Sequence, residues 1–478
     1  MRVEYIGLSE IRGPLVILED VEDVAYDETC RFTLENGEKR FGRIIAIDGS
    51  RAVIQVFEGT KGISLENCRT QFLGHPLRIP LSPEILGRSF DGAGRPIDGL
   101  GEVYPDTWRS VNGSAINPVS RKYPRNYIST GLSAIDGMAT LIQGQKLPIF
   151  SGSGLKHNEL TAQMLRQARI PDQENAEFAI VFAAVGIKHD VADYFRRDLE
   201  ESGALERTVM FLNLASDPII ERILTPRCAL TAAEYLAFTH GYHVLVIMTD
   251  VTAYCEALRE FSSSMGEIPS RKGFPSYLYS DLASLFERAG MITGLPGSIT
   301  QMPILTMPND DITHPIPDLT GFITEGQIVL SRELEQRGIY PPISVLASLS
   351  RLMKDGIGAG FTREDHPDLS NQLFASYAKV QEVRALASVI GEDELAEGDR
   401  LYMQFGRQFE EVFLSQAPDE DRSIERTLDI GWDVLSILPE GELDRIDAAL
   451  LEKYYTPRIR AKESGSLAPP ADTRAKVV

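Results

Sequence analysis

Short apolar runs separated by turn residues dominate the first part of the chain. Four such runs lie at residues 14–18, 31–34, 42–47 and 52–57, and the pairs Asn36-Gly37 and Asp48-Gly49 mark turns between them. Asn-Gly and Asp-Gly pairs favour tight turns because these residues accept positive φ. Short strands at this even spacing predict a small β-barrel, which we place at residues 1–75.

Longer apolar runs alternate with helical patterns in the middle of the chain. Residues 178–185 are almost continuously apolar, and similar runs occur at residues 209–212, 244–248 and 299–305. A parallel strand that is covered on both faces has this pattern. Residues 222–238 repeat with helical spacing between two of the runs. Strands that alternate with helices predict a parallel α/β domain, which we place at residues 76–364, after Gly- and Pro-rich links at 90–99 and 117–124.

From about residue 365 the apolar positions recur every three or four residues. This spacing predicts a helical bundle over residues 365–462. Residues 463–478 contain Gly, Ser and a Pro-Pro pair and are expected to be a disordered tail. The sequence therefore predicts a multi-domain protein with an N-terminal β-barrel, a central α/β domain and a C-terminal α-helical bundle.

The composition is that of a globular protein with an excess of acidic residues. The 478 residues are 43% hydrophobic and carry a formal net charge of −21. General nucleic-acid binders have a basic surface, so this charge argues against nucleic acid as a partner. No run of 18 apolar residues occurs, so we expect a protein that is soluble and not exported. The four cysteines lie far apart without metal-ligand spacing, which favours reduced thiols and no metal site: Cys30, Cys68, Cys228 and Cys255.

The apolar residues 147–150 lead into a glycine-containing loop and a helical pattern, as in an ATP-binding phosphate loop. A functional loop reads G-x-x-x-x-G-K-[ST], in which the lysine reaches the β- and γ-phosphates and the hydroxyl residue binds Mg²⁺. If Gly154 is the last glycine, Leu155 replaces the lysine and Lys156 replaces the hydroxyl residue. Gly152 and Gly154 remain as candidate nucleotide contacts, and Lys156 is expected to be exposed.

Asp250 is a further candidate nucleotide-site residue. It follows the apolar run 244–248, at the position where P-loop ATPases place a carboxylate that helps to hold Mg²⁺. The alternative is that Asp250 only caps the end of a strand. The sequence alone leaves both interpretations open.

Residues 341–351 carry a more specific motif near the end of the α/β domain. Two prolines are followed by an aliphatic and a polar residue, then by Ser348, Ser350 and Arg351. This segment resembles the signature of alpha/beta-type rotary ATPases, although Ser344 stands where aspartate or asparagine is usual. Further segments resemble motifs of the B (beta) subunit of archaeal/vacuolar-type ATPases and extend the similarity from the barrel to the bundle: residues 87–92, 217–227, 256–260, 280–283, 314–321 and 363–366.

The resemblance implies a place in a rotary motor. In this family the B subunit is the non-catalytic partner of the catalytic A subunit in a hexamer of alternating chains (A3B3). The complex couples ATP hydrolysis or synthesis to proton or sodium transport, with ATP or ADP and Mg²⁺ at the interface with the A subunit. Central-shaft and peripheral-stalk subunits, and indirectly the membrane rotor, are the other implied partners. The chain would be cytoplasmic and peripheral to the membrane, with residues 266–275 facing the shaft.

For the site residues, the resemblance implies that Arg351 is placed against ATP bound on the A subunit, with Ser348 and Ser350 beside it as further nucleotide-binding residues. A guanidinium group is always charged and donates a planar fork to phosphate oxygens. An arginine supplied in trans is worth about 10³–10⁵ in rate. The alternative is a surface arginine in an ion pair.

A catalytic rotary ATPase also has a glutamate after the strand at 178–185, which orients the attacking water. Ile187 lies there in this chain and cannot polarise water. The loop lysine, the loop hydroxyl and this carboxylate are all absent, which predicts a chain with no catalytic site of its own.

Two other hypotheses fit a barrel followed by an ATPase domain. One is a self-sufficient hexameric ATPase, such as a secretion-export ATPase, and the degenerate loop and Ile187 count against it. The other is an RNA-translocating hexamer, which the net charge of −21 disfavours. ATP turnover of the purified chain, measured with and without RNA and with an added A subunit, would separate the three.

Overall fold

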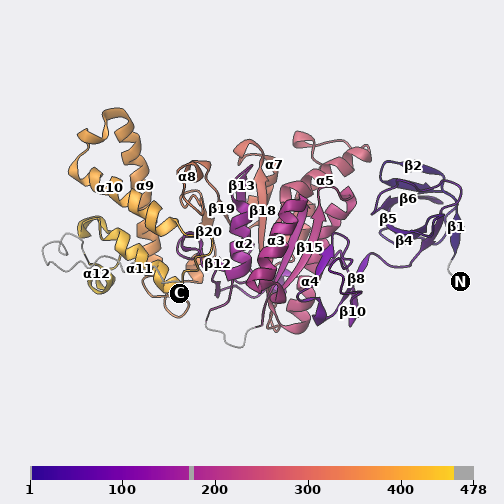
Figure 1. The fold of residues 1–478 in the computed structure, drawn as a ribbon, viewed down its shortest axis with the longest axis horizontal. Coiled ribbons are helices and arrows are strands. Elements are labelled where there is room, and N and C mark those ends of the chain that lie inside the picture. Colours follow the sequence, from indigo (N-terminus) through magenta and orange to yellow (C-terminus); the bar gives the residue numbers. More distant parts are fainter. Residues whose placement is uncertain (1–2, 172–176, 457–478) are drawn as a thin grey trace, which may run out of the picture.

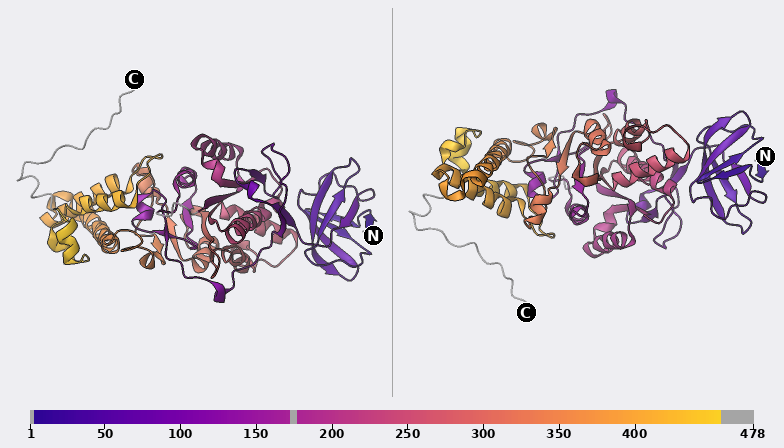
Figure 2. Two further views of the ribbon diagram at one scale, coloured as in Figure 1. Left: turned by 90° about the horizontal axis from the view of Figure 1, so that it is seen from below. Right: turned by 90° about the horizontal axis from the view of Figure 1, so that it is seen from above.

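The computed structural model describes residues 3–171 and 177–456, so the expected tail at 463–478 lies outside the described residues. Three parts follow one another along the long axis of the molecule (Figure 1). Strands lie at the N-terminal end, a mixed α/β part lies in the middle and helices lie at the opposite end. The perpendicular views show the same order (Figure 2). This arrangement confirms the predicted fold class.

Seven N-terminal strands form an antiparallel sheet that curls around an apolar core. They are β1 (Glu4–Ile6), β2 (Glu10–Arg12), β3 (Leu15–Leu18), β4 (Thr29–Thr33), β5 (Lys39–Asp48), β6 (Arg51–Val56) and β7 (Arg69–Phe72). Their spatial order is β1-β7-β4-β5-β6-β3-β2. The four expected strands correspond to β3–β6, and Gly37 and Gly49 take positive φ in the turns between them. The apolar pattern misses β1, β2 and β7 because these strands are short and mostly polar.

A nine-stranded sheet forms the centre of the molecule. Its strands are β9 (Ser89–Asp91), β13 (Ile149–Gly152), β14 (Phe178–Ile187), β15 (Thr208–Leu214), β16 (His243–Thr249), β17 (Gly290–Met291), β18 (Ser298–Met307), β19 (Gly326–Val329) and β20 (Leu349–Ser350). The order is β20-β19-β13-β18-β16-β14-β15-β9, with β17 beside β18. Only β17 and β20 pair antiparallel to their neighbours. The four expected strands correspond to β14, β15, β16 and β18.

Helices cover both faces of this sheet. On β14, Ile180 and Phe182 belong to an apolar cluster with residues of α2 (His157–Gln167) and α3 (His189–Ser202). Val181 and Ala183 belong to a second cluster with residues of α4 (Ile219–His240), α5 (Val251–Ser264) and α6 (Leu278–Phe286). The remaining short elements are α1 (Ser133–Asp136), α7 (Pro315–Ile323), α8 (Arg332–Gln336), the β8–β10 ribbon (Arg78–Leu81 and Thr107–Ser110) and the β11–β12 ribbon (Tyr127–Ile128 and Leu141–Ile142).

One local feature of this sheet follows the prediction in spite of a proline, and another differs from it. Pro303 lies inside β18, opposite Met248, although proline is rare in central strands because it has no N–H to donate. β18 keeps its strand structure at Pro303 because it is buried and paired between β13 and β16. The link at 90–99 also begins as a strand: β9 pairs with β15, and Phe90 stacks on Phe211 with ring centroids 5.2 Å apart.

Helices at the C-terminal end confirm the predicted bundle. They are α9 (His366–Ile390), α10 (Glu397–Gln408), a π-helix (Phe409–Leu414), α11 (Ile424–Leu435) and α12 (Ala448–Tyr454). At the start of the bundle the fully buried Asp365 accepts hydrogen bonds from Arg363 Nε and Trp432 Nε1, both at 2.6 Å. These bonds fasten α11 to the beginning of α9.

One arginine joins the barrel to the central domain. Arg95 pairs with Asp91 at 2.6 Å, with Glu58 after β6 at 2.9 Å and with Glu221 on α4 at 2.5 Å. Three carboxylates around one guanidinium leave an excess of negative charge in a largely buried place, which favours protonation of one of them. Burial raises the pKa of Glu58, and burial also raises that of Glu221 to about 7.

We expect the pH dependence of stability to change in Glu221→Gln. The pKa of Glu221 is raised from 4.5 to about 7 in the folded chain, so its stabilising contribution is fully present below pH 4.5 and is lost as pH rises through 7. Glutamine cannot ionise, so the variant should lack this loss. Thermal unfolding between pH 5 and 8 measures the difference, with the exposed Glu201→Gln as a control. Parallel pH profiles of Glu221→Gln and the unsubstituted chain would contradict the expectation.

Candidate functional site

The degenerate loop joins β13 to α2 at the edge where the parallel strands end, here called the carboxyl edge. Gly154 has a φ of 82°, and the side chain of Lys156 is exposed, as the sequence predicts. Leu155, at the position of the phosphate-binding lysine, is 5% exposed and belongs to the same apolar cluster as Leu160 on α2. The residue at the lysine position therefore stabilises the core and offers no charge to a phosphate.

Asp250 also lies at the carboxyl edge, at the end of β16. Its Oδ1 accepts hydrogen bonds from the backbone N of Thr252 at 2.8 Å and of Thr306 at 3.1 Å. The first bond caps α5, and the second ties the end of β16 to β18. These contacts favour the capping interpretation of Asp250, although they leave Oδ2 available. Ile187 ends β14 at the same edge and is 9% exposed.

An ion pair that the sequence motifs do not indicate lies beside the loop. Asp310 follows β18 and Arg332 begins α8, and Arg332 Nε lies 2.7 Å from Asp310 Oδ2. Arg332 Nη2 also donates to the carbonyl of Ser153 at 2.9 Å. A Cβ at residue 152 would lie only 2.0 Å from Asp310 Oδ1, so a larger residue there would have to displace the Asp310 side chain and its ion pair. The sequence could have indicated both residues as candidates, because each charged residue follows an apolar strand, as Asp250 does.

The two candidate serines of the 341–351 segment, Ser348 and Ser350, make bonds within the chain. Ser348 Oγ accepts from the backbone N of Val329 at 2.9 Å and donates to the carbonyl of Ser344 at 2.7 Å. Ser350 is 7% exposed, and its Oγ donates to the carbonyl of Thr140 at 2.8 Å. These contacts fasten β20 to the sheet. Both hydroxyl groups thus support the segment that carries Arg351.

Arg351 differs from most arginines of this chain. Its backbone N donates to the carbonyl of Glu325 at 2.9 Å, but its side chain is exposed and makes no hydrogen bond, ion pair or ring contact with the part of the chain that the structure describes. The alternative of a surface ion pair within the chain is therefore wrong for the described residues. An exposed guanidinium with no internal partner is available to another molecule.

The structure places Arg351, with Ser348 and Ser350, away from the candidate residues of the loop and of β16. Gly152, Gly154 and Asp250 come together at the carboxyl edge. β20 runs antiparallel to β19, and Ser350 is paired with Gly326, the first residue of β19. Arg351 follows Ser350 and therefore lies at the opposite edge, where the parallel strands begin. Since the loop and the arginine face different sides, one copy of the chain does not bring them to the same nucleotide.

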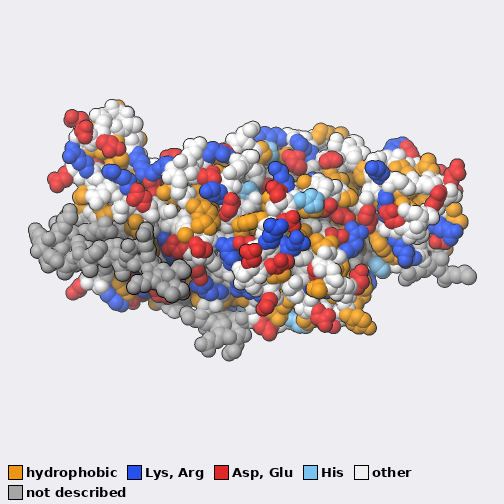
Figure 3. Space-filling view, in the orientation of Figure 1, with side chains coloured by type: hydrophobic (Ala, Val, Ile, Leu, Met, Phe, Trp, Pro, Cys, Tyr) orange, Lys and Arg blue, Asp and Glu red, His pale blue; other side chains and the backbone are white. Residues whose placement is uncertain are grey.

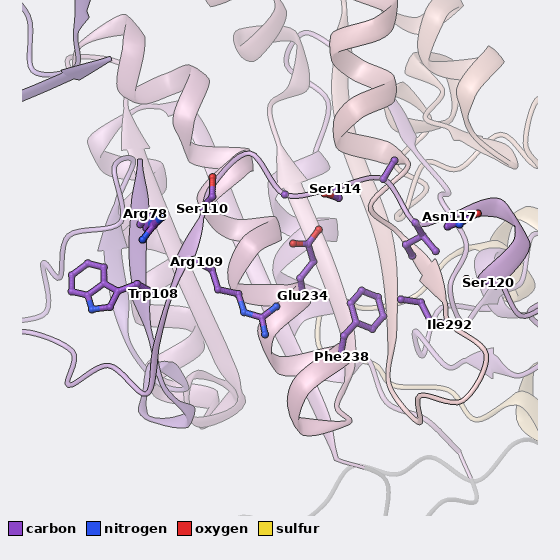
Figure 4. Close-up of a pocket in the computed structure, with 13 residues that line it drawn as sticks. Arg78, Trp108, Arg109, Ser110, Ser114, Asn117, Ser120, Glu234, Phe238 and Ile292 are labelled. Carbon is purple, nitrogen blue, oxygen red and sulfur yellow. The ribbon is translucent and has the colours of Figure 1, made fainter. Parts of the chain in front are cut away.

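A surface pocket of about 740 Å³ lies elsewhere, between the β8–β10 ribbon and α4 (Figure 4). Glu234 in its wall binds the fully buried Arg288, with Oε1 2.6 Å from Nε. Arg109 donates to Thr239 Oγ1 at 2.9 Å. Glu234 and Arg109 therefore hold the fold together, and none of the candidate site residues lines this pocket. The described residues also contain no group of three or more His, Cys, Asp or Glu side chains that could hold a metal ion.

Comparison with known proteins assigns the barrel, most of the central domain and the helical bundle. Residues 8–74 match the ATP synthase alpha/beta family, beta-barrel domain, and residues 131–350 match the nucleotide-binding domain of that family. Residues 355–455 match the C-terminal domain of V and A type ATP synthase. A V-type ATP synthase beta chain of Halothermothrix orenii is 64% identical over 452 residues, covering 95% of this chain and 97% of the relative. The chain belongs to the V-type ATP synthase beta-chain family.

Other relatives agree with this assignment. The V-type ATP synthase beta chain 2 of Clostridium tetani is 63% identical over 456 residues, covering 95% of this chain and 99% of its own. The solved structure of the ATP synthase subunit NeqB from Nanoarcheaum equitans superposes with a TM-score of 0.70 at 39% identity. That match covers 88% of this chain and 98% of NeqB. The family resemblance read from the motifs is confirmed, and it outweighs the export-ATPase and RNA-translocase hypotheses.

Among the described residues, no helix combines the length and the apolar character needed to cross a membrane.

Proposed function

We propose that this chain is the non-catalytic subunit of a V-type ATP synthase and supplies Arg351 in trans to ATP bound on the catalytic A subunit. The observation that carries the proposal is the position of Arg351. It is exposed, has no partner in the described chain and lies at the edge of the sheet opposite its own loop. In a ring of alternating subunits, such an arginine can face the nucleotide site of a neighbour.

The loop of this chain supports the non-catalytic part of the proposal. Leu155 is buried where a phosphate-binding lysine would be needed, and Ile187 ends the strand where a catalytic glutamate would orient water. Neither side chain can stabilise charge on a transferring phosphoryl group. ATP or ADP with Mg²⁺ is accordingly proposed to bind at the interface with the A subunit, where Mg²⁺ would neutralise developing charge on the phosphates.

A guanidinium at that interface fits the chemistry of phosphoryl transfer. Charge develops on the γ-phosphate oxygens in the transition state, and preorganised donors at those oxygens lower the barrier. A factor of about 10³–10⁵ in rate corresponds to roughly 4–7 kcal/mol. Arg351 can donate two parallel N–H groups to phosphate, which a lysine cannot. Ser348 and Ser350 are proposed to hold the segment in place.

The remaining partners follow from membership of the same complex. We propose that the central-shaft and peripheral-stalk subunits and, indirectly, the membrane rotor are further partners of the chain. These partners would make the chain peripheral to the membrane and cytoplasmic. Within the proposed shaft-facing loop, Arg271 and Lys272 lie near Asp318 and Asp311, at 3.5 and 3.3 Å. Acidic and basic side chains are interspersed on the face of the molecule that Figure 3 shows, and the net charge of −21 argues against nucleic acid as a partner.

Reconstitution tests the proposal. The isolated chain should show no ATP turnover above the buffer background, because Leu155 and Ile187 supply no charge to the reaction. Adding the A subunit of the same complex should give hexamers that hydrolyse ATP. Turnover by the isolated chain at a rate near that of the hexamer would refute the non-catalytic assignment. RNA should leave the rate unchanged in every case.

A further inference from the structure

A buried glutamine connects the two chain segments that meet at Arg351. Gln145 is fully buried, and its Oε1 accepts the backbone N–H of Ile142 at 3.0 Å. Its Nε2 donates to the carbonyl of Glu325 at 3.1 Å and to Ser350 Oγ at 2.9 Å. The carbonyl of Glu325 also accepts the backbone N–H of Arg351. One amide group thus binds both the residue before Arg351 and the acceptor of its backbone N–H.

The residue next to Gln145 anchors Glu325 a second time. Lys146 Nζ lies 2.9 Å from Glu325 Oε1 and 2.7 Å from Glu287 Oε1, and the backbone N of Lys146 donates to Glu325 Oε2 at 2.8 Å. Lys146 is 3% exposed, so its ammonium is held inside the protein by these carboxylates. Residue 325 is thereby fixed in both its backbone and its side chain.

The side chain of Arg351 has no comparable support. Since nothing in the described chain holds its guanidinium, the direction of the side chain depends on the backbone from which it projects. Catalytic groups need to be held within about 0.5 Å of their working position, and a displacement of about 1 Å can cost 10²-fold in rate. The contacts that fix the backbone at residues 350–351 should therefore affect the rate of catalysis.

We propose that Gln145 is a positioning residue for Arg351, an inference that rests on the proposed function of Arg351. Gln145 lies in the segment leading into β13, on the sheet edge opposite the degenerate loop. It touches no nucleotide in this role. It fixes the backbone of the β20 segment, so that Arg351 projects toward the neighbouring subunit in one orientation.

The chain offers a closely matched control. Gln372 on α9 is 2% exposed and makes the same three kinds of contact: its Nε2 donates to Ser376 Oγ at 3.0 Å and to the carbonyl of Glu442 at 3.1 Å, and its Oε1 accepts the backbone N–H of Arg445 at 2.9 Å. Gln145→Leu and Gln372→Leu therefore remove equivalent buried amides. Only the first of these amides adjoins Arg351.

In hexamers reconstituted with the A subunit, Gln145→Leu should lower kcat for ATP hydrolysis about tenfold, with KM changed by less than about twofold. Gln372→Leu should change neither constant by more than about twofold. In the isolated chain, amide hydrogen exchange in the peptide containing Arg351 should be faster in Gln145→Leu and unchanged in Gln372→Leu. If Gln145→Leu does not assemble, Ser350→Ala replaces it, because this variant removes the same contact from the other side.

The decisive experiment combines Gln145→Leu with Arg351→Ala in the same hexamers. If Gln145 acts through Arg351, then Gln145→Leu should cause no further loss of rate in Arg351→Ala hexamers, measured in single turnover. An equal loss in both backgrounds, or a normal kcat in intact Gln145→Leu hexamers, would overturn the positioning role. A normal kcat in Arg351→Ala hexamers would instead refute the proposed function, so the two failures are distinguishable.

Discussion

Hexamers that carry Arg351→Ala are expected to hydrolyse ATP about 10³-fold more slowly than unsubstituted hexamers, while assembly is retained. The side chain is exposed and makes no hydrogen bond or ion pair in the described chain, so its removal should leave the fold intact. The loss would then report what the guanidinium does at the neighbouring nucleotide site. Because charge on the γ-phosphate develops in the transition state, kcat should fall more than nucleotide affinity.

Two further variants make this measurement specific. Arg351→Lys should recover little of the rate, because a point charge lacks the planar fork of donors. Arg197→Ala removes another exposed arginine without a partner in the described chain, on α3, and should leave turnover within about twofold. If Arg351 only linked two subunits through an ion pair, the substituted hexamers would loosen yet keep their turnover once assembled. Normal kcat in intact Arg351→Ala hexamers would therefore exclude the catalytic role.

The apolar pattern predicts much of this fold because burial dictates it. The strand at 178–185 is continuously apolar since helices cover both of its faces, and that requirement is visible in the sequence alone. The apolar pattern does not predict β7, whose four residues include Arg69 and Gln71. This strand is held in the sheet by its backbone pairing with β1 and β4. Backbone pairing of this kind leaves little trace in side-chain chemistry.

In the candidate site, too, residue types can be predicted from the sequence, whereas contacts between distant segments cannot. The loss of loop chemistry at Leu155 can be predicted, because it is a change of residue type at a fixed spacing. The direction of the Ser350 hydroxyl cannot be predicted from the sequence, because it depends on Gln145, which lies 205 residues away in the chain. The ion pair of Asp310 and Arg332 likewise forms only when the ends of β18 and β19 meet at one edge. Contacts between distant segments are therefore what the structure adds.

A buried carboxylate holds the central domain to the helical bundle. Glu410, in the π-helix, is 1% exposed, and its Oε1 accepts hydrogen bonds from Arg337 at 3.0 Å, Arg384 at 2.8 Å and the Tyr377 hydroxyl at 2.6 Å. Arg337 follows α8 in the central domain, whereas Arg384 and Tyr377 belong to α9. Burial alone would raise the pKa of Glu410, but these hydrogen bonds outweigh it and hold the pKa below its ordinary value.

Glu410→Ala should destabilise the isolated chain by about 3–5 kcal/mol, because it leaves two guanidinium groups and a phenol without their shared acceptor. Arg337 and Arg384 are 37% and 22% exposed, so water can compensate in part and the lower end of this range is expected. The exposed neighbour Glu411→Ala should change stability by about 0.5 kcal/mol or less. Since the pKa of Glu410 is lowered in the folded chain, its contribution should be lost as pH falls through that lowered value.

Tryptophan fluorescence can follow the bundle separately. The chain has two tryptophans, and Trp432 lies buried in α11 while Trp108 is 57% exposed in β10. In a Trp108→Phe background, urea unfolding monitored by Trp432 should show an earlier transition for Glu410→Ala than for Glu411→Ala. Because the chain has several domains, a bundle-specific probe is preferable to a single unfolding free energy. An unchanged Trp432 transition would mean that apolar packing alone holds the bundle to the central domain, and that the Glu410 bonds only replace bonds to water.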